Sequence, residues 1–516
     1  MLGEPFNICR NLVDDHVSQG RGDRVAVVSN DQELTYDQLL RQSSRIASAL
    51  AEWGGVRIEE RVALIMLDSP EFIQAFLGIV RIGAVCAMMS PLLRPSDYLH
   101  ALNESRARVA IVSEPLLGRI SALPRAELRH LRHLIVVGES TETAVSLAEL
   151  LQSGDEAYPV APTTRDDVAV WIYSSGSTGH PKPCMHPHRT LAASIDLVGK
   201  RFYELGVDDR LFSTAKLFFN YGFMFGLLYP LGVGGQVFLW PGPSTPVNVL
   251  TIIERFRPTV VAAVPSMYSA ILRYAVSQSG TPDLSSVVLA ISAGEMLPAP
   301  LHRAFKERLS WDIVDAIGST EIVTHYASNR RGQTRPGSAG RVIPGFEVRL
   351  EDDDRSLVSP GSIGNLWVRG PTTCLGFWHD HARTRQAIEG EWFRTGDKFV
   401  QDADGYLWFA GRGDDMFKVS GAWVSPVEIE SVLREHPAVM DVAVVGEAGD
   451  DGLLRPKAFV VLAPGYVESP VLVGELQEEV ARELTEYKRP AVIRFIEEIP
   501  RTPSGKAKRF VLREGK

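Results

Sequence analysis

Short apolar, β-branched segments alternate with helix-like segments through the N-terminal part of the chain. Residues 61–67 (RVALIML) precede a helix-like stretch, and residues 168–173 (VAVWIY) precede a Gly/Ser loop and a second helix-like stretch. Three more buried-strand candidates are 259–265, 287–294 and 312–318. This alternation predicts an α/β protein with largely parallel sheets that are covered by helices.

The sequence pattern changes twice towards the C-terminus. From about residue 340 the strands become shorter and are separated by Gly, Pro and Asp turns, which predicts a small β-rich subdomain at about 335–411. After GRGDD (411–415) the pattern is that of a compact α+β unit. Because 516 residues are too many for one hydrophobic core, we expect a large N-terminal domain, 1–411, and a small mobile C-terminal domain, 412–516.

Composition limits the partners that the chain can have. The formal net charge of −9 is mild for this length and argues against nucleic-acid binding, which needs a concentrated basic surface. The most apolar stretch is interrupted by Arg81 and is too short to span a membrane, and the acidic N-terminus does not resemble a signal peptide. The four cysteines, Cys9, Cys86, Cys184 and Cys374, form no CxxC pair, which favours reduced thiols. We expect a cytoplasmic enzyme without nucleic-acid or membrane partners.

A loop rich in glycine and hydroxyl groups, YSSGSTGHPKP (173–183), follows one predicted strand. Its glycines allow close backbone approach, while its N–H groups, hydroxyls and lysine can surround an anion. The candidate phosphate-binding residues are Ser174, Ser175, Gly176, Ser177, Thr178, Gly179 and Lys182. The P-loop spacing is absent, and such a turn by itself is as often a solvated connection.

Five further segments, taken together with this loop, indicate a protein family. They are SAGEMLP (292–298), AIGSTE (316–321), TGD (395–397), GRGDD (411–415) and TPSGKAKR (502–509). In this order they resemble the signatures of the adenylate-forming superfamily: acyl-CoA ligases, luciferases and peptide-synthetase adenylation domains. The resemblance covers essentially the whole chain. Segments 216–226, 317–329 and 414–430 are most similar to the benzoate and aminobenzoate CoA ligase branch, although Pro183 stands where that family usually has glycine.

The resemblance implies that ATP, with Mg²⁺, converts a carboxylic acid to an acyl-adenylate, and that coenzyme A then takes the acyl group. Adenylation brings two anions together, so positioning and cations are the main catalytic resource. Lys506 would bridge the carboxylate and the phosphate, Glu321 would hold Mg²⁺, and Thr320 would contact the α-phosphate. The residues implied for the adenosine part are Gly294, Glu295, Asp315, Ile317, Asp397 and Arg412, of which Asp397 would accept the ribose hydroxyls.

Thioester formation requires a second arrangement, because Lys506 would stand where the thiol must enter. The resemblance implies that the small domain rotates about a hinge at Asp414. Rotation would bring up a second lysine, Lys418, and a CoA-binding segment with Ser420, Gly421 and Trp423. Taken singly, Lys418 is an exposed strand residue and Lys506 a solvated residue near the C-terminus.

By the same resemblance the ring of the acid would lie among Asn220, Tyr221, Ala293, Gly318, Thr324 and His325. A tyrosine and glycines suit a flat aromatic acid better than a long chain. Asn220 and the Thr324–His325 pair depart from what benzoate would need, which predicts a substituted benzoate: first 2-aminobenzoate (anthranilate), then a hydroxybenzoate. The alternative is that Asn220 and His325 satisfy only each other or the backbone.

Two other functions stay open. A free-standing adenylation enzyme would load the aryl group onto a carrier protein instead of CoA. A regulatory nucleotide-binding protein without catalysis is disfavoured by the joint presence of Lys506, Glu321, Asp397 and Lys418. A dehydrogenase is disfavoured because no GxGxxG opens a strand–helix unit.

Overall fold

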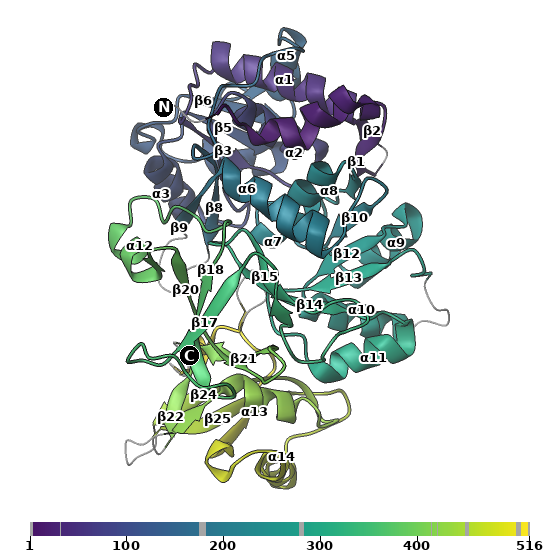
Figure 1. Ribbon diagram of the computed structural model, residues 1–516, viewed down its shortest axis with the longest axis vertical. Helices are drawn as coiled ribbons and strands as arrows, with labels where there is room; N and C mark the ends of the chain where they lie inside the picture. The colour runs from purple at the N-terminus through teal and green to yellow at the C-terminus, as the bar shows by residue number, and fades with distance from the viewer. Residues whose placement is uncertain are drawn as a thin grey trace.

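A computed structural model describes residues 4–30, 32–174, 182–277, 283–413, 415–419, 422–448, 454–501 and 507–513. Two large sheets with their helices form the upper part of the molecule in Figure 1, and the C-terminal unit lies below them.

The first large sheet has seven strands in the order β7-β6-β5-β3-β4-β8-β9, all parallel except the edge strand β9. Its strands are β3 (Arg61–Ile65), β4 (Val85–Met88), β5 (Val109–Ser113), β6 (His133–Val137), β7 (Val145–Ser146), β8 (Val168–Ser174) and β9 (Lys182–Pro187). The connecting helices are α2 (Pro70–Arg81), α3 (Pro95–Ser105), α4 (Glu114–Ser121), η3 (Arg125–Glu127) and α5 (Leu147–Gln152).

The second large sheet has nine strands in the order β16-β15-β14-β13-β12-β10-β11-β1-β2, with a parallel centre and antiparallel edges. Its strands are β1 (Val25–Ser29), β2 (Gln32–Thr35), β10 (Arg210–Ser213), β11 (Gln236–Phe238), β12 (Val260–Ala263), β13 (Leu289–Ser292), β14 (Val314–Ser319), β15 (Thr324–Ser328) and β16 (Arg341–Val342). Its helices are α6 (His188–Ser194), η4 (Ile195–Phe202), α7 (Asn220–Phe223), η5 (Met224–Leu228), α8 (Tyr229–Val233), α9 (Pro246–Phe256), α10 (Pro265–Ser277) and α11 (Ala299–Leu309).

The N-terminal segment forms η1 (Arg10–Asp14), η2 (Val17–Arg21) and the long helix α1 (Tyr36–Glu52), which begins at a capping box of Thr35 and Gln38. Helix α1 packs against α2, where Gly78 permits close approach: a Cβ at Gly78 would lie 2.6 Å from Cγ2 of Ile46. Almost all of α2 is buried, because it lies in the main hydrophobic core.

A smaller antiparallel sheet follows the two large ones. It consists of β17 (Glu347–Glu351), β18 (Ile363–Arg369), β19 (Ile388–Glu389), β20 (Trp392–Gln401) and β21 (Leu407–Arg412), with α12 (His381–Ala387) before β19. The α/β class predicted from the sequence is confirmed, with helix-connected, largely parallel sheets and a smaller β-rich part.

The C-terminal unit is built on a hairpin and a three-stranded sheet. The hairpin is β22 (Phe417–Val419) and β23 (Ala422–Val424), and the sheet is β24 (Val439–Ala448), β25 (Leu454–Leu462) and β26 (Val492–Phe495). Its helices are α13 (Pro426–Leu433), α14 (Pro470–Glu483), η6 (Glu486–Lys488) and α15 (Arg509–Arg513). Ile429, Leu433 and Val444 are among the residues of its own apolar core.

Within the described ranges, no helix is long and apolar enough to cross a membrane.

Candidate active site

The candidate site forms where strands of the two large sheets end. Ser174 is the last residue of β8, Gly294 and Glu295 follow β13, and Thr320 and Glu321 follow β14. The carboxyl ends of parallel strands are the usual place for ligands in open α/β sheets. The predicted residues of the phosphate, adenine and magnesium segments that the structure describes are therefore collected from two sheets into one region.

His186 ties the two sheets together at this region. It lies on β9, is fully buried, and its Nε2–H donates to the carbonyl oxygen of Thr320 at 2.8 Å. Because a carbonyl can only accept, Nε2 carries the proton, and burial lowers the pKa of the imidazole to about 4. A neutral histidine thus holds the loop after β14 against the strand that follows the phosphate loop.

Several predicted residues lie outside the described ranges. They are Ser175, Gly176, Ser177, Thr178 and Gly179 of the phosphate loop, the hinge residue Asp414, Ser420 and Gly421 of the CoA segment, and Lys506. In the β22–β23 hairpin the backbone of Lys418 pairs with that of Trp423; the structure describes the backbone of these two residues but not their side chains.

The two ends of the phosphate loop are described. Ser174 and Lys182 are register partners at the mouth of the β8–β9 hairpin, and Oγ of Ser174 donates to the Lys182 carbonyl at 3.3 Å. Nζ of Lys182 lies 3.5 Å from Oε1 of Glu104 on α3. The loop thus starts and ends at one point, and its lysine is held there by a carboxylate.

Asp315 supports the adenine-side loop from β14. Its Oδ2 accepts the N–H of Leu297 at 3.2 Å, and its carbonyl accepts the N–H of Asn329 at 2.9 Å. The side chain is 5% exposed, and burial raises the pKa of its carboxyl to about 7. Gly294 in this loop has φ +91°, a conformation that favours glycine, and Ile317 is half-buried on β14.

Asp397 and Arg412 face each other across β20 and β21. They are register partners, and Nε of Arg412 lies 3.3 Å from Oδ1 of Asp397. The Asp397 side chain is 15% exposed, so the carboxylate is held in place but partly accessible. This fits a group that accepts two adjacent hydroxyls.

Glu321 provides a carboxylate at the junction of these segments. Its carbonyl accepts the N–H of Cys374 at 2.8 Å, which fixes the backbone. Burial raises the pKa of its carboxyl, and the charges of Arg383 and Arg412 oppose that rise. In the described part of the chain no three His, Cys, Asp or Glu side chains gather around a common point. One protein carboxylate plus substrate phosphates is the donor set that Mg²⁺ commonly uses, so Glu321 fits this ion.

Aromatic side chains form the candidate acyl pocket. The His325 ring lies 5.7 Å from that of Tyr221 and 5.8 Å from that of Phe225. The Tyr221 side chain is held in place by its hydroxyl, which donates to the Ile291 carbonyl of β13 at 2.9 Å. Ala293 is buried at the end of β13. These rings form one aromatic wall, in which the His325 ring is tilted by 47° to that of Tyr221 and by 38° to that of Phe225.

Gly318 keeps this wall open. It lies at a bulge between β14 and β15, opposite His325. A Cβ at Gly318 would lie 2.3 Å from the carbonyl oxygen of Thr324 and 3.0 Å from Cδ2 of His325. Any side chain would therefore collide with the backbone of β15 unless the two strands moved apart.

The polar residues of the pocket have different partners from one another. Thr324 is fully buried, and its hydroxyl pairs with that of Tyr229 at 2.6 Å. Nδ1 of His325 pairs with the Tyr203 hydroxyl at 2.6 Å. Asn220 donates from Nδ2 to the Ser319 carbonyl at 3.2 Å. Among the described residues no hydrogen bond joins Asn220 to His325. The other half of that alternative is found for one atom of Asn220, because Nδ2 bonds to the backbone, whereas Oδ1 has no partner.

Buried polar atoms without a hydrogen-bond partner occur around the site. Among described residues they include the Tyr173 hydroxyl, Oδ1 of Asn220 and the Tyr326 hydroxyl. An unpaired buried polar atom costs about 1–3 kcal/mol, so it calls for an explanation such as a ligand. Tyr326 and His186 were not among the predicted site residues; both lie in or next to segments that carried predictions.

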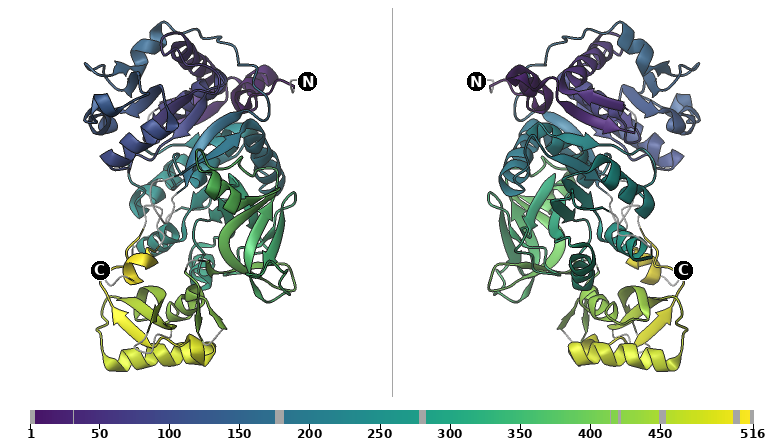
Figure 2. Two further views of the ribbon diagram at one scale, coloured as in Figure 1. Left: turned by 90° about the vertical axis from the view of Figure 1, so that its left-hand side faces the viewer. Right: turned by 90° about the vertical axis from the view of Figure 1, so that its right-hand side faces the viewer.

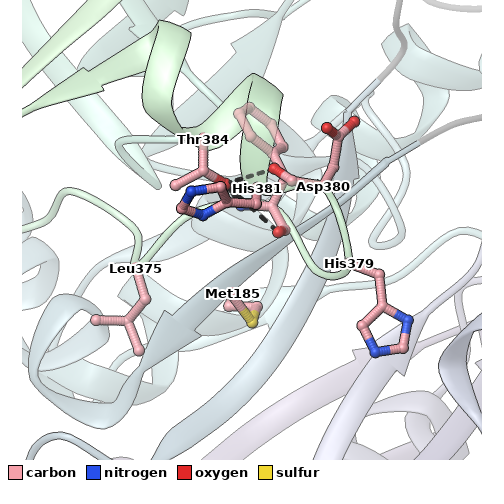
Figure 3. A pocket seen from close by; sticks show the side chains of 7 residues that line it. Met185, Leu375, His379, Asp380, His381 and Thr384 are labelled. Carbon is pink, nitrogen blue, oxygen red and sulfur yellow. Dashed lines mark hydrogen bonds between the residues drawn. The ribbon is translucent and has the colours of Figure 1, made fainter.

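A separate hollow of about 420 Å³ lies beside β9 and α12. Figure 3 shows Met185, Leu375 and His381 around it. Thr384 donates its hydroxyl to the Asp380 carbonyl at 2.9 Å on its rim. None of the predicted site residues lines this hollow.

Known proteins match the chain along its length. The family of AMP-binding enzymes matches residues 14–378, and the C-terminal domain of AMP-binding enzymes matches residues 428–506. A benzoate–CoA ligase of Thauera aromatica is 38% identical over 99% of this chain and 96% of its own. The crystal structure of an anthranilate CoA ligase in complex with anthranoyl-AMP superposes with a TM-score of 0.94, with 40% identity over 100% of this chain and 98% of that one.

A second solved structure, a benzoate CoA ligase of Burkholderia xenovorans, has a TM-score of 0.89 and 36% identity over 98% of this chain and 100% of that one. These relatives extend over all the segments that surround the site. The chain belongs to the AMP-binding, adenylate-forming enzyme family, in its branch of benzoate and anthranilate CoA ligases.

Proposed function

We propose that the protein is an aryl-CoA ligase that consumes ATP and releases AMP and pyrophosphate. The acid first becomes an aryl-adenylate, and the thiol of coenzyme A then takes the aryl group. The observation that carries the proposal is that the Ser319–Glu321 segment is linked to both regions. Asn220 of the acyl pocket donates to the Ser319 carbonyl, and Arg412, which pairs with Asp397, acts electrostatically on the Glu321 carboxyl.

In the first step the chain's own residues bind and orient two anions. The phosphate loop, which ends at Ser174 and Lys182, surrounds the phosphates with N–H groups, hydroxyls and a cation. Lys506 neutralises charge between the carboxylate and the α-phosphate, and Thr320 donates its hydroxyl to that phosphate. Glu321 would hold Mg²⁺, which would offset charge on the phosphates. Asp397, assisted by Arg412, accepts the ribose hydroxyls.

In the second step the C-terminal unit turns about Asp414. This movement withdraws Lys506 and brings Lys418 to the adenylate, while Ser420, Gly421 and Trp423 line the path of the pantetheine arm. A hinge needs only a few positions that absorb a large change in φ and ψ. In this proposal, two parts of the chain move relative to each other: residues 1–411 and residues 412–516.

The side chain of Asn220 favours a ring with a hydrogen-bond donor. The orientation of its amide follows from its partners, because the Ser319 carbonyl only accepts and so faces Nδ2. Met224 Sδ, a weak acceptor, lies 3.7 Å from the same nitrogen. This leaves Oδ1 as an unpaired acceptor. An amino or hydroxyl group on the ring would satisfy Oδ1, and benzoate would not.

Both groups meet this need, and the likeness to the anthranilate CoA ligase makes anthranilate the proposed substrate, with hydroxybenzoates next. The test compares kcat/KM for benzoate, the aminobenzoates, the hydroxybenzoates, cinnamate and short fatty acids, with free CoA as acceptor. Since an unpaired buried acceptor costs about 1–3 kcal/mol, we expect a donor-bearing benzoate to exceed benzoate by roughly tenfold or more.

Asn220→Ala supplies the matched variant. It should lower kcat/KM for the preferred acid by roughly tenfold and leave benzoate nearly unchanged, because only the former uses Oδ1. A variant that loses both acids equally would contradict this role for Asn220. If a fatty acid exceeds every aromatic acid, or if no thioester forms from free CoA while a carrier protein is loaded, the aryl-CoA ligase proposal fails.

A further inference from the structure

The segment that follows Lys506 is fixed to the C-terminal unit by buried charges. Arg509 of α15 donates from Nη2 to both carboxylate oxygens of Glu430 on α13, at 2.7 and 2.9 Å. The Glu430 side chain is 3% exposed and also accepts the N–H of Val444 at 2.8 Å. A charge this deeply buried needs its partner, so the pair anchors α15 to α13.

Asp415 joins the same cluster from the opposite side. Its Oδ1 accepts from Nη2 of Arg513 at 3.0 Å, and its Oδ2 accepts from Nη1 of Arg509 at 3.4 Å. Two arginines of one short helix thus share one carboxylate. Asp415 is also the residue directly after the proposed hinge position 414.

The backbone of Asp415 reaches across that hinge position. Its N–H donates to the carbonyl oxygen of Arg412 at 3.0 Å. Arg412 in turn pairs with Asp397, the proposed ribose acceptor, at 3.3 Å. Contacts therefore run without interruption from the ribose side of the site, through Asp415, to α15.

The loop that carries Lys506 is closed at its base by described residues. Arg501 and Ala507 form an antiparallel bridge, and the N–H of Lys508 donates to the Pro500 carbonyl at 2.7 Å. Arg509 follows directly, so a contact that fixes Arg509 also fixes the C-terminal stem of the loop. Figure 2 shows α15, at the yellow end of the chain, on the side of the C-terminal unit that faces the rest of the molecule.

We propose that Asp415 is a positioning residue for aryl-adenylate formation, which acts through Arg509 and Arg513 to hold the stem of the Lys506 loop in a fixed relation to the hinge and to the Asp397–Arg412 pair. In this role Asp415 acts through the two arginines and needs no contact with substrate or reacting atoms. Thioester formation does not need this placement, because Lys506 has then left the site. The inference rests on the proposed role of Lys506.

Asp415→Asn tests the proposal, because it removes the charge at constant size. Helix α15 keeps a second anchor in this variant, since the Arg509–Glu430 pair is untouched and Leu512 is buried in a separate apolar cluster. Arg513→Gln removes the shorter of the two contacts of Asp415 with α15 and keeps the one with Arg509. Arg509 itself is unsuitable, because its loss removes the nearest charged partner of the buried Glu430 and leaves only Arg434, at 3.7 Å.

Two half-reactions are measured with the acid that the wild type activates best. We expect kcat for ATP–pyrophosphate exchange to fall at least about tenfold in Asp415→Asn and Arg513→Gln, as misplacement of a catalytic group does. The KM for ATP and the conversion of pre-formed aryl-AMP by CoA should stay within about twofold. Glu447→Gln is the control: it breaks an ion pair of the same unit, with Lys457 at 2.7 Å, and should change neither half-reaction.

An equal loss of both half-reactions in Asp415→Asn would overturn the proposal, since it would mark a purely structural role. Unchanged exchange would overturn it as well. Lys506→Ala, measured in parallel, separates the two levels of the account. If Lys506→Ala retains exchange, the proposed role of Lys506 is wrong, and this inference is wrong with it. If Asp415→Asn retains exchange and Lys506→Ala does not, only the positioning role of Asp415 is wrong.

Discussion

The hydroxyl of Tyr203 and Nδ1 of His325 lie 2.6 Å apart, buried behind the wall of the proposed acyl pocket. Burial lowers the pKa of His325 to about 3, so the imidazole is neutral at physiological pH. The same ring packs against Tyr221 and Phe225. Tyr203 thus sets the orientation of a ring that the substrate would contact.

Tyr203→Phe removes this hydrogen bond and leaves a buried nitrogen without its partner. The variant should lose about 1–3 kcal/mol of stability, visible as a lower denaturation midpoint. Because the His325 ring is then less well held, the KM for the acid should rise while the KM for ATP stays near the wild-type value. Equal changes in both KM values would contradict a local role in the acyl pocket.

Gly318→Ala tests the need for open space between β14 and β15. The new methyl group would lie 2.3 Å from the Thr324 carbonyl oxygen, so the strands must separate and the pocket must deform. We expect kcat/KM for the acid to fall by roughly a hundredfold.

Gly474→Ala is the control for Gly318→Ala. This glycine lies in α14, and a Cβ there would meet nothing within 4 Å. It should keep full activity and gain up to about 1 kcal/mol, because alanine is the better helix former. A fully active Gly318→Ala would show that the close approach is not required.

His186 makes a pH-dependent contribution to stability. Its pKa in the folded protein is about 4, against the ordinary value of 6.5, so the unfolded chain takes up the proton first as the pH falls. Its contribution is therefore complete above about pH 6.5 and declines towards pH 4.

His186→Gln retains an N–H donor for the Thr320 carbonyl but cannot titrate. The difference in unfolding free energy between wild type and variant should shift by about 2 kcal/mol in favour of the variant between pH 7.5 and 4.5. Denaturation at several pH values measures this difference, and a constant difference across the range would contradict a neutral, buried His186.

The two lysines should separate the half-reactions. Lys506→Ala should abolish most ATP–pyrophosphate exchange and largely spare the reaction of pre-formed aryl-AMP with CoA, whereas Lys418→Ala should do the reverse. Asp414→Pro, which fixes φ at the hinge, should slow the overall reaction more than exchange. If each lysine variant loses both activities to the same degree, the two lysines do not alternate at one site.

Most of the fold was accessible from the sequence because hydrophobic patterning decides which segments become buried strands. The run 168–173 became β8, and 312–318 overlaps β14. Strand β9 was not predicted, since its segment KPCMHP contains Pro183 and Pro187 and reads as a loop. It exists because β9 is an edge strand, where a missing N–H donor is tolerated.

The contacts of the site could be predicted only in part. The motifs predicted a role for each residue. Which atoms contact one another depends on how the two large sheets pack, and the motifs do not specify that. The bond from His186 to Thr320 joins β9 of one sheet to the loop after β14 of the other, and no local sequence pattern predicts it. The unpaired Oδ1 of Asn220 likewise follows from the position of the Ser319 carbonyl, which the sequence does not specify.

The central claim is that the carboxylate of an aromatic acid attacks the α-phosphorus of ATP. Anthranilate labelled with ¹⁸O in its carboxylate tests it, with AMP, pyrophosphate and any other phosphate product analysed by mass spectrometry after turnover with CoA. The account predicts one ¹⁸O atom in AMP and none in pyrophosphate. Unlabelled AMP, or ADP with labelled inorganic phosphate, would contradict it.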